Sequence, residues 1–158
     1  MMRMRKYMKA VAAMVLIAAM LCGSALAASM GAKVFSTSMS VYSSNSTRNK
    51  IGTLKRGTSF TVTKVSGSWA KISYKGRTGY AKMKDIVFNK HVKAVSTKST
   101  PIRFLTKSSY KKNTYYTGTL SSGVTLYVAG VNGSYYLFYD ESGKVMGYVK
   151  KSAVRKAS

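Results

Sequence analysis

Acidic side chains are almost missing from this sequence of 158 residues, which has three Asp and Glu against 27 Lys and Arg and a formal net charge of +24. His91 is the only histidine, and the chain has one cysteine and one proline. Paired-carboxylate hydrolysis, a carboxylate metal cage and a Ser-His-Asp triad therefore have almost no residues to build on. One proline argues against a Pro-rich linker. Hydrophobic residues still make up 46% of the chain, so it is not a low-hydrophobicity disordered tail.

The first 27 residues have the three parts of a secretory signal peptide. A basic head at residues 1–9 is followed by an apolar run from Ala10 to Cys22 and then by Ala25-Leu26-Ala27. The run is shorter than the roughly 20 apolar residues of a transmembrane helix. We expect a signal helix that is cleaved after Ala27, and no transmembrane segment in the mature chain. Lipid attachment at Cys22 is the weaker alternative, because the preceding Leu21 is too large for a lipoprotein signal.

Removal of residues 1–27 would leave a net charge of +20 and no cysteine. Cysteine nucleophiles, zinc ribbons and redox motifs are thereby excluded from the mature chain. An exported chain of this size without disulfides must depend on a hydrophobic core. The expected location is the exterior or the cell envelope.

The mature chain contains one pattern twice. Residues 51–57 (IGTLKRG) correspond to 117–123 (TGTLSSG), 65–69 (VSGSW) to 131–135 (VNGSY), and 76–82 (GRTGYAK) to 143–150 (GKVMGYVK). The offset between the copies is 66 residues in the first two blocks and rises to 68 in the last. Three blocks in the same order at a nearly constant offset indicate a duplication.

Each copy has the pattern of short β-strands. Residues 60–65 alternate apolar and polar side chains, and Ala70, Ile72 and Tyr74 fall on one face of the next predicted strand. Pairs such as Lys75-Gly76 and Asn132-Gly133 are typical of tight hairpin turns. We predict an all-β protein of two small SH3-like, partly open barrels in tandem.

These blocks resemble the bacterial SH3 (SH3b) family, which shows an Ile-Gly-x-Leu-x-x-Gly block, a Gly-Trp turn-strand and a Gly-x-x-Gly-Trp/Tyr-Val segment. The resemblance covers residues 32–88 and 91–156, which are the two expected domains. The first copy has Tyr42 where the family often has Arg, whereas the second copy keeps Arg103. Tyr135 stands in the position of Trp69, and Tyr80 and Tyr148 stand where Trp is common. The resemblance implies a targeting module that binds peptidoglycan or other wall polymers, here without the hydrolase domain that often accompanies it.

No catalytic, cofactor or metal site is expected. His91, the one possible imidazole base, lies at the junction of the copies, and nothing in the sequence designates a nucleophile for it. Asp85 and the Asp140-Glu141 pair stand beside predicted turns or strand ends, where turn capping is the simpler role.

The basic residues are distributed over both copies, with net charges of +11 for residues 32–90 and +9 for residues 91–158. Such a surface favours anionic polymers, and their binding should weaken as salt rises. Eighteen of the mature basic residues are Lys and five are Arg, which favours diffuse attraction over a specific phosphate site. Peptidoglycan and teichoic-acid-like polymers are the preferred partners, ahead of lipid head groups and nucleic acid. The simplest alternative is a charge that only keeps the protein soluble.

Aromatic residues are dense in the second copy, and they provide the candidate binding surface. Tyr136 and Phe138 align with the expected core positions of the first copy, which places Tyr135, Leu137 and Tyr139 on the opposite face. That face is predicted to bind a ligand or the other domain, and burial by the other copy is the competing interpretation. The candidate ligand-binding residues share this face or carry the family motif, and they are Trp69, Tyr80, Arg103, Tyr135, Leu137, Tyr139 and Tyr148.

The sequence therefore predicts an exported, non-catalytic tandem SH3b protein that binds the bacterial envelope. The alternative is a protein–protein interaction or adhesion module that acts on an exported partner or a host surface. A membrane-damaging cationic protein is disfavoured, because no amphipathic helix is predicted.

Overall fold

The computed structural model describes residues 29–158. The expected signal peptide, its cleavage after Ala27 and the lipid attachment at Cys22 lie outside the described residues. Among residues 29–158 there is no helix with the length and hydropathy needed to cross a bilayer.

The described chain forms two seven-stranded antiparallel sheets, so the predicted all-β class is confirmed. The first unit, residues 30–88, contains β1 (Met30–Val34), β2 (Ser38–Tyr42), β3 (Lys50–Lys55), β4 (Ser59–Ser66), β5 (Trp69–Tyr74), β6 (Arg77–Lys82), the 3-10 turn η1 (Met83–Asp85) and β7 (Ile86–Phe88). The second unit, residues 92–156, contains β8 (Val92–Ser96), β9 (Thr100–Thr106), helix α2 (Lys107–Lys111), β10 (Tyr116–Leu120), β11 (Thr125–Asn132), β12 (Tyr135–Tyr139), β13 (Val145–Lys150), η2 (Lys151–Ala153) and β14 (Val154–Lys156).

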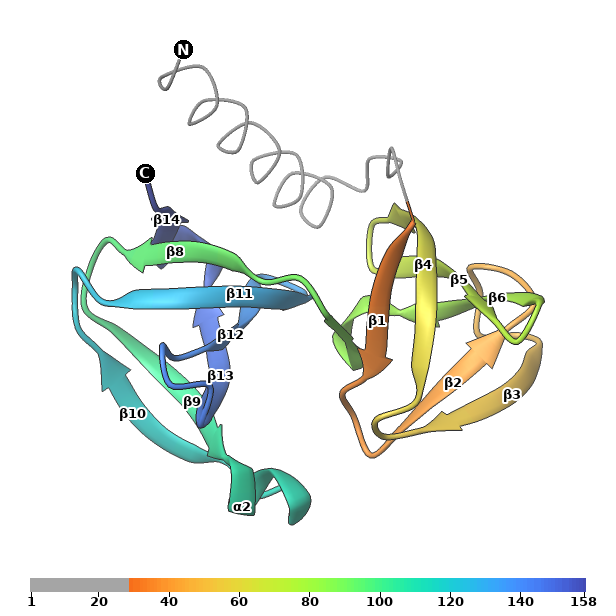
Figure 1. The fold of residues 1–158 in the computed structure, drawn as a ribbon, viewed down its shortest axis with the longest axis horizontal. Coiled ribbons are helices and arrows are strands. Elements are labelled where there is room, and N and C mark those ends of the chain that lie inside the picture. The colour runs from red at the N-terminus through yellow and green to blue at the C-terminus, as the bar shows by residue number, and fades with distance from the viewer. Residues whose placement is uncertain (1–28) are drawn as a thin grey trace.

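The two sheets have the same strand order. The first runs β3-β2-β6-β5-β4-β1-β7 and the second β10-β9-β13-β12-β11-β8-β14. Each strand of the first unit thus has a counterpart at the same place in the second, and the two units lie side by side in Figure 1. The domain boundaries 32–88 and 91–156 stay predictions, but each sheet falls almost entirely within one of them.

The hairpins follow the predicted turn chemistry. Lys75 and Gly76 both have positive φ, 47° and 75°, at the tip of the β5–β6 hairpin. Two successive positive φ values belong to the type I′ turn, whose twist matches that of the flanking strands. The alternation in β4 is interrupted by a bulge, with a register shift against β5 between Val62 and Lys64. As a result Val62 and Val65 both face the core.

One helix was not anticipated from the sequence. The five residues of α2 follow β9 and begin with a capping box, in which Ser109 N donates to Thr106 Oγ1 at 3.2 Å and Thr106 N donates to Ser109 Oγ at 2.8 Å. The helix is too short to show an apolar period, which explains why the sequence pattern did not reveal it. The connection between β2 and β3 in the first unit contains no helix.

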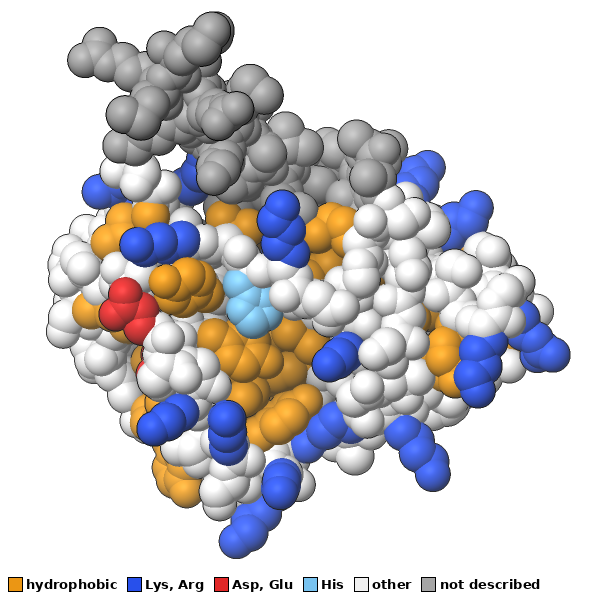
Figure 2. All heavy atoms as spheres, viewed as in Figure 1, with side chains coloured by type: hydrophobic (Ala, Val, Ile, Leu, Met, Phe, Trp, Pro, Cys, Tyr) orange, Lys and Arg blue, Asp and Glu red, His pale blue; other side chains and the backbone are white. Residues whose placement is uncertain are grey.

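The buried core is continuous between the units. One cluster of buried side chains runs through both sheets and includes Phe88 and Val92 on either side of the connection. A second cluster, the junction cluster, consists of Phe35, Leu105, Leu137 and Met146. Because Phe35 belongs to the first unit and the other three to the second, this cluster joins the two units. Figure 2 shows hydrophobic side chains around the chain's one histidine, with Lys and Arg spread over the visible face.

Candidate functional site at the junction of the units

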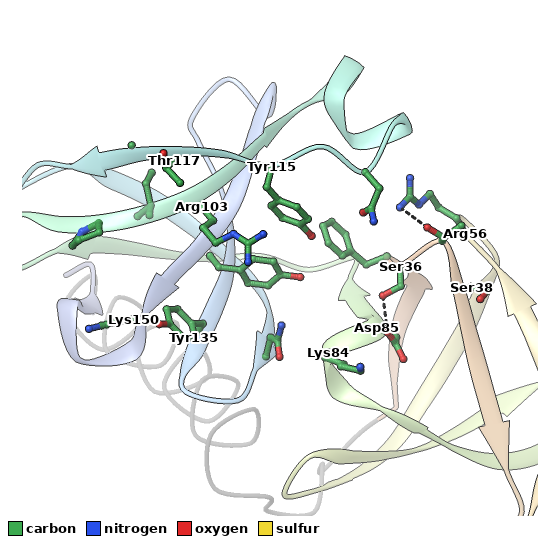
Figure 3. A pocket seen from close by; sticks show the side chains of 18 residues that line it. Ser36, Ser38, Arg56, Lys84, Asp85, Arg103, Tyr115, Thr117, Tyr135 and Lys150 are labelled. Atoms are coloured by element: carbon green, nitrogen blue, oxygen red, sulfur yellow. Dashed lines mark hydrogen bonds between the residues drawn. The ribbon is translucent and has the colours of Figure 1, made fainter. Parts of the chain in front are cut away.

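A groove of about 830 Å³ lies where the two units meet. The first unit contributes its β1–β2 connection, Arg56 and η1. The second contributes β9, β10, β13, the segment after α2 and the adjoining ends of β11 and β12. Figure 3 shows Ser36, Asp85 and Arg56 facing Arg103, Tyr115 and Tyr135 from opposite sides. The groove therefore exists only because the two units pack together.

The first-unit wall is polar. Ser36 Oγ donates to Asp85 Oδ1 at 2.6 Å, and Phe35 N donates to the Asp85 carbonyl at 2.7 Å. Arg56 Nη2 donates to Thr37 Oγ1 at 3.3 Å. These bonds hold the β1–β2 connection against η1 and keep the single carboxylate of the wall in place.

The second-unit wall combines a guanidinium with phenol rings. The Arg103 guanidinium lies 4.7 Å from the centre of the Tyr115 ring, and the Tyr115 and Tyr148 rings are stacked with centroids 6.2 Å apart. Burial raises the pKa of the Tyr148 hydroxyl, and the neighbouring Tyr115 adds a smaller rise. Tyr135 is 40% exposed and pairs across the strands with Lys150. This wall offers flat rings and cationic donors to a ligand.

Tyr110 of helix α2 contacts Phe35 and Arg56 of the first unit and so connects the two walls of the groove. Its ring stacks on Phe35 at 5.0 Å between centroids and lies 4.0 Å below the Arg56 guanidinium. Its hydroxyl donates to the Phe35 carbonyl, and Arg56 Nη1 donates to the Tyr110 carbonyl at 2.6 Å. We call Phe35, Arg56 and Tyr110 the clasp. Every one of these contacts links the two units, so the clasp sets the groove's width.

The groove lining carries an excess of positive charge. Its four cationic side chains, Arg56, Lys84, Arg103 and Lys150, face one carboxylate, Asp85. Arg56 is held by the clasp and Asp85 by Ser36, which leaves Arg103, Lys84 and Lys150 for a ligand. Such a lining suits a polar ligand with negative groups and sugar or ring faces.

The structure brings together three of the predicted site residues. Arg103, Tyr135 and Tyr148 all line the groove. Trp69 and Tyr80 do not line it, since they lie on β5 and β6 of the first unit. Since Leu137 and Tyr139 lie at the junction cluster, the predicted site is divided among three places.

Leu137 and Tyr139 occupy the inter-unit side of the predicted face. Leu137 is 2% exposed within the junction cluster, where the first unit supplies Phe35, so it is closed to a soluble ligand. Tyr139 packs against the same cluster and stacks on His91 with centroids 4.9 Å apart. Burial raises the pKa of Tyr139 to about 12. Leu137 therefore packs between the units, which is the inter-domain alternative of the predicted face.

Two of the groups considered for catalysis, His91 and Asp140, are held by neighbouring residues. Burial lowers the pKa of His91, opposed by a hydrogen bond with the Phe88 backbone. Asp140 accepts from Ser142 Oγ at 2.6 Å and from the Lys144 and Val145 amides at 3.0 Å, which is a turn-capping role. Burial opposes the ionisation of Asp140, but these hydrogen bonds together lower its pKa. In the part of the chain that the structure describes, no three His, Cys, Asp or Glu side chains are grouped to hold a metal ion.

Sequence reasoning missed Arg56, Phe35 and Asp85 as parts of the site. Tyr115 had a visible signal, because it belongs to the dense aromatic set of the second copy. No sequence signal marked Arg56 or Phe35, because their roles depend on contacts with Tyr110. Tyr110 is 75 residues from Phe35 along the chain.

The fold places this chain among all-β proteins built from two small units with the same strand order. Residues 37–87 match the family model described as Bacterial SH3 domain, and this segment of the first unit belongs to that family. No curated protein matches the chain.

Two solved structures are similar to the chain. "Structure of NlpC1 from Trichomonas vaginalis" has 12% identity and a TM-score of 0.36, over 87% of this chain and 49% of that one. "Structure of NlpC2 from Trichomonas vaginalis" has 8% identity and a TM-score of 0.37, over 84% of this chain and 49% of that one. The chain spans about half the length of these structures.

Proposed function

We propose that this protein is an exported, non-catalytic module that binds the bacterial cell envelope, with peptidoglycan or an anionic wall polymer in the groove. The observation that carries the proposal is the groove itself, where Arg103 and Lys150 stand beside the rings of Tyr115, Tyr135 and Tyr148. The bacterial SH3 match of residues 37–87 supports an envelope-associated module. Wall glycans with peptide or phosphate groups present both the sugar faces and the anions that this lining fits.

Export is supported by residues 1–27, and the absence of catalysis by the small number of acids and the one histidine. His91 stacks on Tyr139, and Asp140 caps a turn by accepting from the Ser142 hydroxyl and the Lys144 amide, so both have structural roles. Expression of the full chain in a secreting bacterium should give a mature protein that begins at Ala28. N-terminal sequencing of the exported protein checks this, and retention of residues 1–27 would contradict it.

The binding proposal is tested by a pull-down on purified wall sacculi, with and without teichoic acid, over a salt series. Arg103→Ala should weaken retention about tenfold, the order expected when one charge-assisted hydrogen bond is lost. Arg155→Ala is the matched control, because Arg155 is exposed and outside the groove. Retention on teichoic-acid-free wall at high salt supports peptidoglycan as the ligand. If retention is lost when teichoic acid is removed from the wall, the ligand is the anionic polymer.

The second candidate is a protein–protein interaction or adhesion module on an exported partner or host surface. Tyr116, which is 49% exposed, and the groove-lining Tyr135 favour it, because exposed aromatic rings are common at interfaces. If the protein shows no wall binding in any buffer, envelope binding is excluded and this candidate takes its place.

A further inference from the structure

The first unit carries a sheet face that combines aromatic rings with lysines. It consists of Tyr42, Lys64, Trp69, Lys71, Tyr80 and Lys82, and we call it the lysine–aromatic face. Cross-strand pairing arranges these residues in two rows. One row runs Lys64–Lys71–Tyr80–Tyr42 over β4, β5, β6 and β2, and the other pairs Trp69 with Lys82. Residues paired in this way have side chains on the same side of the sheet.

The rows place rings and ammonium groups in contact. The Tyr42 and Trp69 rings meet edge to face with centroids 5.5 Å apart, and Lys82 Nζ lies 5.2 Å from the Trp69 ring centre. Lys64 is exposed, and the other five residues are partly exposed. The face is therefore open to a ligand.

Lys64 and Lys71 stand directly opposite each other on β4 and β5. Like charges in this position destabilise a sheet, so fold stability gives no reason for the pair. No described carboxylate neutralises it, because Asp85 is bonded to Ser36 in the groove, and Asp140 and Glu141 belong to the second unit. An anion from outside would remove the repulsion.

In the second unit, the face that corresponds to this one is covered, and the two lysine positions hold different residues. The counterparts of Lys64 and Lys71 are Gly130 and Leu137, which are paired in the same register on β11 and β12. Leu137 is buried in the junction cluster, and a Cβ on Gly130 would lie 2.8 Å from the Ile86 carbonyl of the first unit. The covered copy thus has a small and an apolar residue where the open copy has two lysines.

Three of the four remaining positions of the face keep the chemistry of the groove, and the fourth has Tyr42 in place of Arg103. Trp69 corresponds to Tyr135, Tyr80 to Tyr148 and Lys82 to Lys150, and all three second-unit residues line the groove. The open face therefore repeats the groove's ring-and-lysine set and adds the lysine pair.

We propose that the lysine–aromatic face is a second binding site, separate from the groove, for an acidic glycan chain. A phosphate or carboxylate of the chain lies between Lys64 and Lys71, and a neighbouring sugar ring packs on Trp69 and Tyr80. This inference deepens the proposed envelope binding and rests on it for the biological source of the glycan. Phosphodiester and uronic-acid glycans share the chemistry that the site recognises.

Trp69 is the only tryptophan in the chain, so its fluorescence reports on this face alone. The purified mature protein, residues 28–158, is titrated with three oligomers: a glycerol-phosphate oligomer with sugar substituents, an oligogalacturonate and the neutral chitohexaose. Affinity is measured by calorimetry and site occupancy by Trp69 emission. We expect the acidic oligomers to bind and change the emission, with a Kd that rises with salt, and chitohexaose to bind at least tenfold more weakly.

The double variant Lys64→Gln/Lys71→Gln should raise the Kd for the acidic oligomers about tenfold or more. The matched control Lys93→Gln/Lys98→Gln removes the same charge from exposed positions of the second unit and should stay within about twofold. Equal losses in the two variants would show attraction by net charge alone and would overturn the site. Binding without any change in Trp69 emission, or equal binding of chitohexaose, would also overturn it.

Arg103→Ala separates this inference from the proposed function. Wall retention that depends on Arg103, with no Trp69 response to any oligomer, would leave the groove proposal standing and reject the second site. A Trp69 response that depends on Lys64 and Lys71, with no effect of Arg103→Ala on wall retention, would reject the groove and keep the second site.

Discussion

Gly130 is the residue whose size the junction restricts most directly. It lies in β11 at the bulge against β12, and its backbone faces the Ile86 carbonyl of the other unit. A side chain there would meet backbone, which cannot rotate away. The absence of a side chain therefore allows β11 and β7 to approach each other.

Gly130→Ala should lower the free energy of unfolding by about 1–3 kcal/mol, the usual cost of overpacking. Gly52→Ala is the matched control, because a Cβ at Gly52 has no atom within 4 Å. The control should change stability by about 0.5 kcal/mol or less. Denaturant unfolding of both variants checks this, and equal stabilities would contradict the close approach at Gly130.

His91 should make the stability of the protein depend on pH. Its pKa is lowered in the folded state, chiefly by burial, so the unfolded chain binds a proton more readily. Stability should then be full above the ordinary histidine value of 6.5 and fall as the pH drops below it, until the folded-state pKa is passed.

Thermal unfolding at pH 7.5 and pH 5.5 measures this effect. His91→Gln, which cannot titrate, should have a smaller difference in Tm between the two pH values than the parent protein. Asp140 does not interfere, because its lowered pKa places its titration below 3.8. An unchanged difference in the variant would show that other groups cause the pH dependence.

At the level of elements, α2 is the part of the second unit without a counterpart in the first. It reaches the first unit through Tyr110, whose ring lies between Phe35 and Arg56. The clasp links α2, the β1–β2 connection and Arg56, the residue just after β3. A change in any of these segments should affect both the junction and the groove.

The coupling within the clasp can be measured with a double-mutant cycle of Arg56→Ala and Tyr110→Ala. We expect a coupling free energy of about 0.5–1 kcal/mol, because the cation–π contact is lost in either single variant. Tyr110→Phe alone should cost about 1 kcal/mol, since it removes only the hydroxyl that donates to the Phe35 carbonyl.

Tyr116→Ala paired with Arg56→Ala is the control cycle, because Tyr116 is 49% exposed and contacts Phe104 rather than the clasp. Its coupling should be about zero. If the coupling free energy of Arg56 and Tyr110 were as close to zero as that of the control cycle, the clasp would not join the units in solution.

For the whole molecule, two binding sites on one chain would give avidity for a long polymer. Loss of one site should then weaken binding to a long acidic glycan by a larger factor than binding to a short oligomer, on the order of 10²-fold against tenfold. The variants Arg103→Ala and Lys64→Gln/Lys71→Gln are compared with the parent by surface retention on the long and short forms. Equal factors for both lengths would show that the two sites never bind one chain together.

Much of the fold could be predicted from the residues alone, because it rests on local properties. The alternation from Phe60 to Val62, the turn at Lys75-Gly76 and the burial of Ala70 and Ile72 depend on neighbours within one hairpin. Side-chain period and turn chemistry act over a few residues, so they are readable without the tertiary structure. The all-β class and the bacterial SH3 character of residues 37–87 followed from these patterns.

The assignment of the second copy's aromatic face needed the tertiary structure. The strand period correctly placed Tyr135, Leu137 and Tyr139 on one side, but it could not say what covers that side. Leu137 is covered by the first unit, whereas the Tyr135 end of the same face opens into the groove. The physical reason is that Phe35, Arg56 and Tyr110 meet only after both units have folded, and such contacts leave no periodic trace in the sequence.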